Sequence, residues 1–331
     1  MSTPATDTAR RVVIRAPGPA DALEVESFEP PPPGSGEVRV RHEAIGVNFI
    51  DVYFRSGAYP WPVDADLVTG SEAAGVVDAL GEGVESFAPG RRVAYTVANG
   101  AYATHRNVAA SQLVALPDGI DAETAAAVML KGLTVRYLVG DSYAARPGDT
   151  VLFHAAAGGV GSLAGRWLAA RGVTVIGTAG GPEKCAAARE RGYAHAIDYR
   201  AEDFVERVAE LTGGAGVDAV YDGVGHDTVK GSLACLKRFG TLVSFGQSSG
   251  PADYFRIGDL AAGSFRLQRP TLFHYTAERA WLEAASAELF ARVADGTLDA
   301  APARRFALDE AAEAHRALES RATSGSTVLV P

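Results

Sequence analysis

The chain has 331 residues, 47% of them hydrophobic and 21% charged, which suits two globular domains of roughly 150 residues each. Its net charge of −9 argues against a general nucleic-acid binder, and no apolar run approaches the roughly 20 residues of a membrane span. The two cysteines, Cys185 and Cys235, form no C-x-x-C pair, which excludes a four-cysteine zinc site and gives no sign of a disulfide framework. Because residues 1–10 are polar and lack an apolar signal core, we expect a cytoplasmic protein.

From residue 11 to about residue 117 the chain looks β-rich. Short strand-like runs, separated by Pro and Gly clusters, occupy residues 12–15, 38–45, 75–80 and 92–96. Many short strands joined by tight turns predict a small barrel-like fold. Two polar segments break this pattern: residues 48–53, which read as a short helix, and residues 70–75, which read as a turn. Asn and Asp cap helices and turns routinely, so each segment has either a structural or a functional role.

Helical character begins near Asp121, which suits the N-cap position of a helix. We expect residues 131–134 to interrupt this helix before it resumes through Tyr137 and Leu138. A turn at residues 147–150 then leads the chain into the apolar run 151–153.

The stretch 150–161, TVLFHAAAGGVG, has the strand, tight turn and following helix (residues 162–171) that a dinucleotide fingerprint requires. The spacing is Ala156-x-Gly158-x-x-Gly161, so Ala replaces the first Gly of the usual motif. A helix N-terminus presents unpaired N–H groups and partial positive charge, which favour a pyrophosphate. A glycine-rich turn can also simply join a strand to a helix, and the residues that follow decide between the two interpretations.

Strands and helices alternate after this turn. The predicted strands are residues 173–177, 195–198, 217–221 and 241–245, with a helix at 183–191 and helical spacing of Phe204, Val208 and Leu211. This alternation predicts a parallel sheet whose ligands bind at the carboxyl ends of the strands.

The end of the second strand indicates which dinucleotide is used. An NAD site places an acid there to hold the ribose 2′-OH, whereas an NADP site avoids it and supplies cations. The residues here are GTAGG, with Lys184 following and Tyr199 and Arg200 able to close the same pocket. Glu183 is the counter-argument, but it lies inside the helix pattern. We therefore favour NADPH.

Beyond residue 270 two helical patterns place Leu282, Ala285, Leu289 and Val293 on one face, and Ala311, Ala314 and Leu318 on another. His315 shares the second helix, and we expect it to be structural. Taken alone, Arg321 reads as a solvated surface charge. A final strand is predicted at residues 327–330.

In combination, seven segments carry a specific resemblance: GVNFIDVYFRSGAYP, TGSEAAGVV, LKGLTVRYL, FHAAAGGVGSLAGRW, YDGVG, VSFGQSSGP and LESRATSGSTVLVP. From about residue 11 to residue 331 the chain resembles zeta-crystallin-type quinone oxidoreductases, a zinc-independent branch of the medium-chain dehydrogenase/reductase superfamily. The resemblance implies an α/β architecture. A GroES-like, β-rich catalytic domain would comprise residues 1–130 and 272–331, and a Rossmann NADPH-binding domain residues 131–271.

The resemblance also implies site residues. Lys184, Tyr199 and Arg321 match positions at the 2′-phosphate end of NADPH, which changes our interpretation of Arg321. Other matches to cofactor-binding positions are Phe49, Ile50, Asp51, Val52, Tyr53, Tyr137, Gly158, Gly159, Val160, Gly180, Gly181, Val224, Gly246, Gln247, Ser248, Ser249, Pro270, Thr271 and Leu272. Candidate catalytic residues are Asn48 and Tyr53, as hydrogen-bond donors to the acceptor carbonyl, and Lys131, as an orienting group; a purely positional role is an equal alternative for each.

Zinc-dependent relatives carry Cys and His ligands where this chain has Asn48, Ser71 and Lys131, none of which is a good zinc ligand. We therefore expect no metal and an easily reduced acceptor: a quinone, reduced by direct hydride or electron transfer. The alternatives are an NADPH-dependent reductase of α,β-unsaturated aldehydes and ketones, and a non-catalytic NADPH-binding protein. The family further implies a homodimer that pairs sheet edges near residues 241–245 and 264–270.

Overall fold

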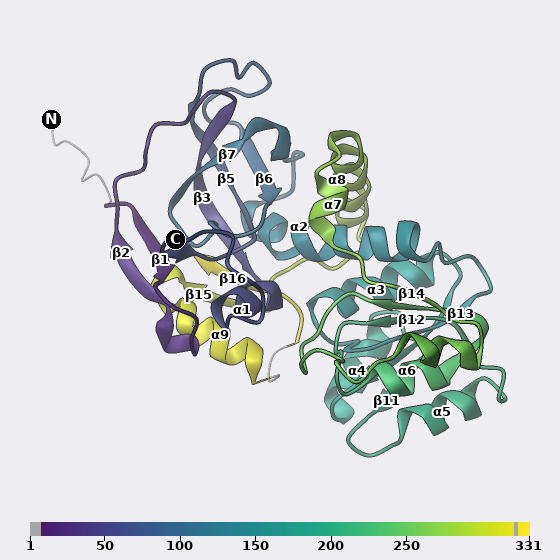
Figure 1. The fold of residues 1–331 in the computed structure, drawn as a ribbon. Helices are drawn as coiled ribbons and strands as arrows, with labels where there is room; N and C mark the ends of the chain where they lie inside the picture. The colour runs from purple at the N-terminus through teal and green to yellow at the C-terminus, as the bar shows by residue number, and fades with distance from the viewer. Residues whose placement is uncertain (1–7, 321–323) are drawn as a thin grey trace, which may run out of the picture. The chain divides into compact units, whose positions relative to one another are not determined.

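The computed structural model describes residues 8–320 and 324–331 (Figure 1). The chain divides into two compact units. The first consists of Met1–Leu130, Phe273–Ala294 and Ala300–Pro331, and the second of Lys131–Leu272 and Asp295–Asp299. Leu272 and residues 295–299, which the sequence predicts in the GroES-like domain, thus fall in the second unit.

The first unit is built on a seven-stranded sheet with the order β15-β16-β3-β5-β6-β8, in which β7 also pairs with β3. A smaller sheet has the order β2-β1-β4. The strands are β1 (Arg10–Ile14), β2 (Glu24–Ser27), β3 (Glu37–Val47), β4 (Leu67–Val68), β5 (Glu72–Leu80), β6 (Arg92–Thr96), β7 (His105–Ala109), β8 (Val114–Ala115), β15 (Arg304–Ala307) and β16 (Thr327–Val330). Short strands and tight turns thus produce the β-rich fold that the composition of this region predicted.

Helices of the first unit follow their predicted faces. They are α1 (Phe49–Arg55), α8 (Arg279–Ala294) and α9 (Ala311–Glu319), with α2 (Ala122–Tyr137) and α7 (Leu272–Thr276) shared between the units. Leu282, Ala285 and Leu289 of α8 are buried, and Ala311 and Ala314 of α9 join the core of the large sheet. Apolar side chains at helical spacing therefore mark the buried faces, as expected.

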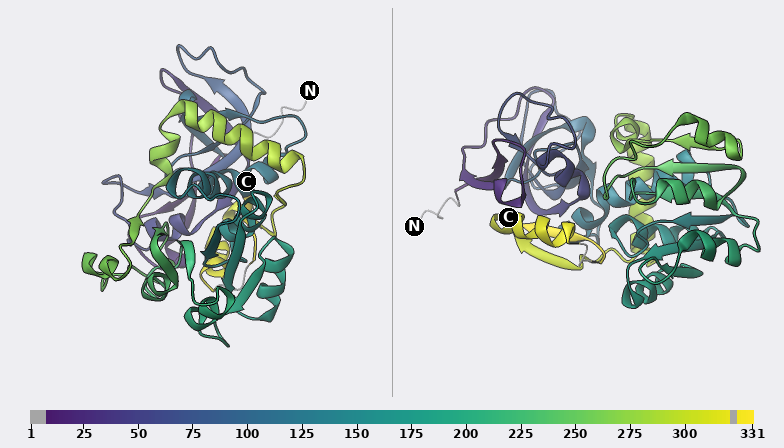
Figure 2. Two further views of the ribbon diagram at one scale, coloured as in Figure 1. Left: turned by 90° about the vertical axis from the view of Figure 1, so that its right-hand side faces the viewer. Right: turned by 60° about the horizontal axis from the view of Figure 1, so that its bottom comes forward.

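The second unit contains a parallel six-stranded sheet with the order β11-β10-β9-β12-β13-β14. Its strands are β9 (Thr150–Phe153), β10 (Thr174–Ala179), β11 (His195–Asp198), β12 (Val217–Asp222), β13 (Leu236–Ser244) and β14 (Arg266–Gln268). The helices are α3 (Gly159–Ala170), α4 (Pro182–Glu190), α5 (Phe204–Leu211) and α6 (Val229–Cys235), and they cover both faces of the sheet (Figure 2). Because all strands are parallel, their carboxyl ends and the loops that follow them share one edge.

The structure corrects three local predictions. α2 runs without interruption through residues 131–134, because Gly132 lies in a buried helix where its cost of about 1 kcal/mol is outweighed by packing. β5 begins at Glu72, so four of the six residues in the predicted turn at 70–75 are strand. β13 begins at Leu236, five residues before the predicted start, because the polar pair Lys237 and Arg238 hides the strand pattern.

No helix among residues 8–320 and 324–331 combines the length and apolarity needed to cross a lipid bilayer.

Candidate functional site

The turn between β9 and α3 has the geometry of an anion site. The predicted residues Gly158, Gly159 and Val160 lie together at the start of α3, with Gly158 as its N-cap and no side chain of the described residues capping it. A Cβ on Gly161 would overlap the carbonyl oxygen of Ala155 and lie 2.8 Å from the Cα of Ala156. Glycine therefore lets the helix begin close against the turn, where its first N–H groups can bind a pyrophosphate.

The loop after β10 brings together the residues predicted for the adenosine end of the cofactor. Gly181 is the N-cap of α4 with φ +102°, and Lys184 lies in the first turn of that helix. A Cβ on Gly180 would lie 2.6 Å from the hydroxyl oxygen of Tyr199, so the phenol lies directly against this glycine. Glycine and tyrosine therefore form a cradle that a larger residue at position 180 would fill. Arg321, the third predicted member, lies outside the described residues.

Asp198, at the end of β11, is a residue of this loop that the sequence reasoning missed. Its Oδ1 atom accepts hydrogen bonds from the backbone N–H of Gly181 at 2.8 Å and of Arg200 at 3.1 Å. One carboxylate therefore holds the turn after β10 to the turn after β11. The only sequence signal for this role was an acid at the end of a predicted strand.

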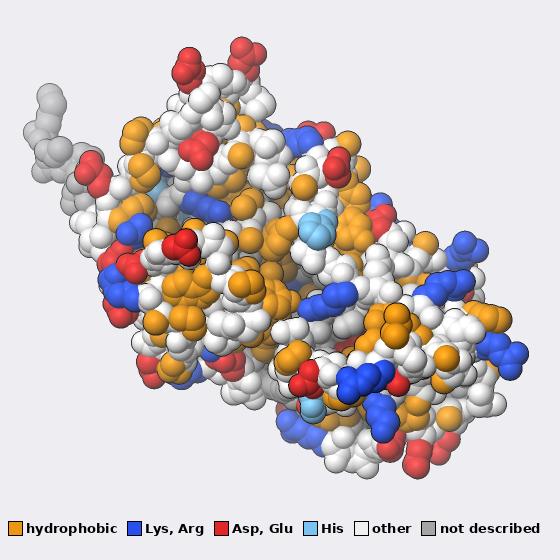
Figure 3. Space-filling model, in the orientation of Figure 1, with side chains coloured by type: hydrophobic (Ala, Val, Ile, Leu, Met, Phe, Trp, Pro, Cys, Tyr) orange, Lys and Arg blue, Asp and Glu red, His pale blue; other side chains and the backbone are white. Residues whose placement is uncertain are grey.

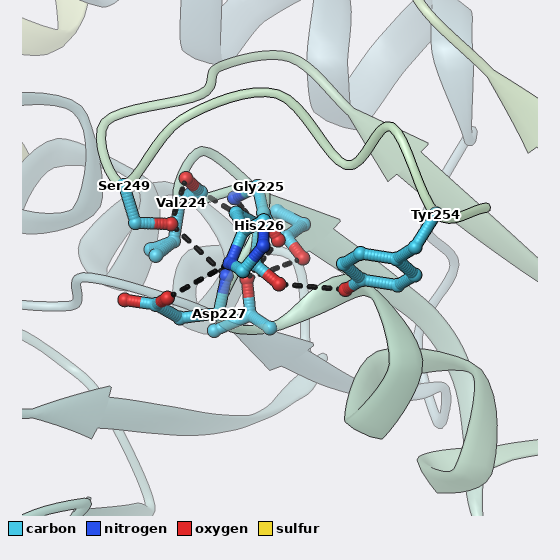
Figure 4. A network of polar contacts seen from close by, with 8 residues as sticks. Val224, Gly225, His226, Asp227, Ser249 and Tyr254 are labelled. Carbon is cyan, nitrogen blue, oxygen red and sulfur yellow. Dashed lines mark hydrogen bonds and ion pairs between the residues drawn. The ribbon is translucent and has the colours of Figure 1, made fainter.

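The loops after β12 and β13 lie against each other and carry further predicted residues (Figure 4). Ser249 Oγ donates to the carbonyl oxygen of Val224 at 2.8 Å, and the Ser249 N–H donates to the same oxygen at 2.9 Å. The Ser248 N–H donates to the carbonyl oxygen of Gly223 at 3.2 Å. Val224 and the turn formed by residues 246–249 are thus joined into one surface at the carboxyl edge of the sheet.

Two other groups of predicted residues belong to the second unit. Tyr137 is the last residue of α2 and is buried. Pro270, Thr271 and Leu272 follow β14, and of these Thr271 is exposed. Arg269, immediately before them, donates to the carbonyl oxygen of Ser244 at 3.0 Å, which ties this segment to the end of β13.

In the first unit, α1 divides the predicted segment into an inner and an outer face. Asp51 and Val52 are buried, whereas Phe49, Ile50 and Tyr53 are partly exposed. The rings of Phe49 and Tyr53 pack with centroids 6.3 Å apart. Only the outer three side chains are therefore placed to contact a ligand directly.

Asn48 and Asp51 are held by a buried set of hydrogen bonds. Asn48 Nδ2 donates to Glu72 Oε1 at 2.8 Å, so the amide uses one of its two N–H groups there. Asp51 accepts from the N–H of Asn48 at 2.9 Å and from Ser71 Oγ at 2.7 Å. The side chain of Lys131, the third candidate catalytic group, is 5% exposed and lies within α2.

The residues at the zinc-ligand positions of related enzymes are thus engaged in other contacts. Ser71 donates to Asp51, and Asn48 donates to Glu72. Among the described residues no group of three or more His, Cys, Asp and Glu side chains is arranged to hold a metal ion. The absence of zinc remains a prediction from ligand chemistry.

A network that the sequence did not reveal links α9 to α1. His315 is fully buried; its Nδ1 atom lies 3.1 Å from Arg55 Nη1 and its Nε2 atom 2.9 Å from the Tyr102 hydroxyl. Tyr102 donates to Asp51 Oδ2 at 3.2 Å. Arg55 also forms a bidentate pair with Glu319 at 2.8 and 2.7 Å. His315 is therefore structural, as expected, and it positions the helix that carries Asp51.

Buried histidines of the first unit lead us to expect lower stability in weakly acidic solution. Burial, helped by the charge of Arg55, lowers the pKa of His315 to about 3, and burial lowers the pKa of His42 to about 3. In an unfolded chain a histidine titrates near pH ~6.5. As the pH falls from that value towards 3, these histidines bind protons in the unfolded state but stay neutral in the folded state. The free energy of unfolding therefore decreases progressively. We expect the unfolding free energy to be about 1 kcal/mol lower per histidine at pH ~5.5 than at pH ~7.

Urea denaturation at the two pH values measures this difference. His315→Gln should reduce this difference in stability by the contribution of one histidine, and His226→Gln, at a side chain that is 52% exposed, is the matched control. Equal stability of the wild type at both pH values would contradict the assignment of neutral buried rings.

Comparisons with known proteins identify the relatives of this chain. Residues 34–118 match the family described as "Alcohol dehydrogenase GroES-like domain", and residues 159–287 match "Zinc-binding dehydrogenase". A quinone oxidoreductase of Pseudomonas aeruginosa is 49% identical over 98% of this chain and 100% of its own length. The 2-haloacrylate reductase of a Burkholderia species is 42% identical over 96% of this chain and 98% of its own.

A solved structure has the same fold as this chain. The Escherichia coli quinone oxidoreductase complexed with NADPH is 44% identical, covers 97% of this chain and 100% of its own, and has a TM-score of 0.95. The predicted combination of a GroES-like and a Rossmann domain is thereby confirmed. The chain belongs to the quinone oxidoreductase family of the medium-chain dehydrogenase/reductase superfamily.

Proposed function

We propose that the chain is an NADPH-dependent reductase of quinones. The observation that carries the proposal is the glycine-lined end of β10, where the Tyr199 phenol lies against Gly180 and Lys184 follows in α4. An NAD site would need a free carboxylate at this strand end. Here the acid of the neighbouring strand, Asp198, accepts from two backbone N–H groups. The relatives support the same conclusion, because one solved quinone oxidoreductase is a complex with NADPH.

The residues of the second unit fit this cofactor. When bound, NADPH supplies the hydride or electrons for the reduction. The first turn of α3 would bind its pyrophosphate, and Lys184, Tyr199 and Arg321 its 2′-phosphate. The other proposed contacts are Tyr137, Gly180, Gly181, Val224, Gly246, Gln247, Ser248, Ser249, Pro270, Thr271 and Leu272.

In the first unit the proposal concerns orientation of the acceptor. Asn48 and Tyr53 would donate hydrogen bonds to the acceptor carbonyl as negative charge develops on its oxygen. Phe49 and Ile50, on the outer face of α1, would contact flat ligands, and Asp51 and Val52 would act from the inner face by positioning the helix. Lys131, the first residue of the second unit, would act as an orienting charge.

Steady-state oxidation of NADPH against a panel of acceptors tests the reaction. We expect turnover with 1,4-benzoquinone and 9,10-phenanthrenequinone, because a site without a metal requires an acceptor that is easily reduced. A kcat/KM roughly tenfold higher for 2-alkenals or 2-haloacrylate would instead identify a reductase of activated double bonds. That alternative is favoured by the 42% identity to a 2-haloacrylate reductase. NADPH binding with no oxidation across the panel would identify a non-catalytic, crystallin-like binding protein.

We also propose a homodimer formed through the open edge at β14. The exposed apolar side chains Phe239, Ile257 and Leu267 are 58%, 84% and 39% accessible, and apolar side chains are visible among cationic ones around β13 and β14 (Figure 3). An unpaired sheet edge of this kind favours association with another strand. Sedimentation velocity measures the mass in solution, and a monomer at every concentration would contradict the proposal.

We propose further that the protein is cytoplasmic and that, within the family, it is of the zeta-crystallin type. The acidic composition and the two free, buried cysteines favour a reducing compartment. Cell fractionation tests the location.

A further inference from the structure

A chain of buried hydrogen bonds connects three neighbouring strand ends of the second unit. His154, the first residue after β9, lies 2.9 Å from Thr178 Oγ1 through Nδ1 and 3.0 Å from Ser232 Oγ through Nε2. Ser232 Oγ lies 3.0 Å from Asp222 Oδ2. Their exposed fractions are 1% for His154, 3% for Thr178 and 0% for Ser232 and Asp222, so water does not compete for these bonds.

The direction of each hydrogen bond follows from the carboxylate of Asp222, at one end of this series of hydrogen bonds. Asp222 can only accept, so the Ser232 hydroxyl donates to it. Ser232 Oγ then accepts from His154, which places the ring proton on Nε2 and leaves Nδ1 to accept from the Thr178 hydroxyl. Burial lowers the pKa of His154, against the opposing field of Asp222, and the ring is neutral. Each side chain in this series of hydrogen bonds therefore has a single assignment of donor and acceptor.

Asp222 extends the chain into the loop after β12. Its Oδ1 atom accepts from the N–H groups of Val224 at 2.8 Å and Gly225 at 3.0 Å, and both carboxylate oxygens accept from Thr228 Oγ1. Ser249 holds the same loop from the other side through Val224 (Figure 4). The geometry of residues 223–228 is thus set by a charge buried at the end of the strand.

Three of the four side chains lie at the starts of three different loops, and the fourth, Ser232, lies in α6. His154 begins the glycine-rich turn, Thr178 precedes the turn that contains Gly180, and Asp222 is the last residue of β12. Strands β10, β9 and β12 are adjacent in the sheet. A shift of one loop would therefore strain the hydrogen bond that joins it to its neighbour.

We propose that Thr178, His154, Ser232 and Asp222 form a positioning network that holds the three loops in the arrangement that binds NADPH. The inference rests on the proposed function. None of the four side chains needs to touch the cofactor. The network has two arms: Thr178 links His154 to the β10 loop, and Ser232 with Asp222 links His154 to the β12 loop. With the pyrophosphate of NADPH at the β9 turn, the adenosine half of the cofactor would lie towards β10. The nicotinamide half would then lie towards β12 and β13.

Cutting each arm separately tests the network. Thr178→Val removes the link to the β10 loop, and Ser232→Ala removes the link to the β12 loop. Calorimetric titration compares NADPH with 2′,5′-ADP, which carries only the adenosine half. We expect Thr178→Val to weaken both ligands by about threefold to tenfold, and Ser232→Ala to weaken NADPH by that factor while leaving 2′,5′-ADP unchanged.

Thr241→Val is the matched control, because it removes a buried hydroxyl from β13 of the same sheet, and both ligands should bind it as they bind the wild type. Thermal unfolding shows which variants are folded. If Ser232→Ala does not fold, Thr228→Val cuts the same arm beyond Asp222 and should give the same split.

A general structural role would make Ser232→Ala weaken both ligands in parallel. Parallel losses in that variant, or no loss of NADPH binding in folded Thr178→Val and Ser232→Ala, would therefore overturn the network. Failure of the wild type to bind NADPH would instead refute the proposed function. The two failures are therefore distinguishable.

Discussion

Replacing Lys184 with alanine should weaken NADPH binding by about tenfold to hundredfold and leave NADH binding unchanged, since a charge-assisted hydrogen bond contributes about 1.5–3 kcal/mol. Lys184 lies in the first turn of α4, whose N-cap, Gly181, carries no side chain. NADH lacks the 2′-phosphate that an ammonium group would bind at this position. Calorimetric titration of both cofactors measures the discrimination directly.

The same experiment should be made with Arg321→Ala, which we expect to behave in the same way. Lys230→Ala, at an exposed lysine of α6 in the same unit, is the matched control for loss of one positive charge. Equal affinity of the wild type for NADPH and NADH, unaffected by either replacement, would contradict the assignment of the 2′-phosphate site.

Gly161→Ala should abolish tight NADPH binding and destabilise the protein by about 1–3 kcal/mol, the usual cost of overpacking. The added methyl group would overlap the carbonyl oxygen of Ala155 and lie 2.8 Å from the Cα of Ala156. Both are backbone atoms, so α3 must move away from the turn. That movement displaces the N–H groups proposed to bind the pyrophosphate.

Gly258→Ala is the control for this substitution, because its Cβ would meet nothing within 4 Å. Urea denaturation and NADPH titration should show wild-type behaviour for Gly258→Ala and losses in both measurements for Gly161→Ala. Normal affinity in Gly161→Ala would mean that the turn after β9 does not contact the cofactor.

The order and kind of most elements could be predicted from the amino-acid sequence alone. Alternating apolar runs and helical spacings predicted β9 to β12. β11 and β16 agree with their predicted bounds, and α5 contains Phe204, Val208 and Leu211, which were predicted to share a helix. The sequence also showed the chemistry of the strand ends, since the glycines after β10 and the position of Lys184 are visible without coordinates. These features are local, because backbone preference and side-chain periodicity act over a few residues.

Contacts between polar groups that are distant in the sequence became visible only in the folded protein. His154 and Ser232 are 78 residues apart, and Tyr102 and His315 are 213 apart, yet each pair is in hydrogen-bond contact. The continuity of α2 through Gly132 was likewise decided by packing and not by helix propensity. The physical reason is the same in each case: a buried polar group or a weak helix former is stable only when the rest of the fold supplies its partners, and no local pattern in the chain encodes where those partners lie.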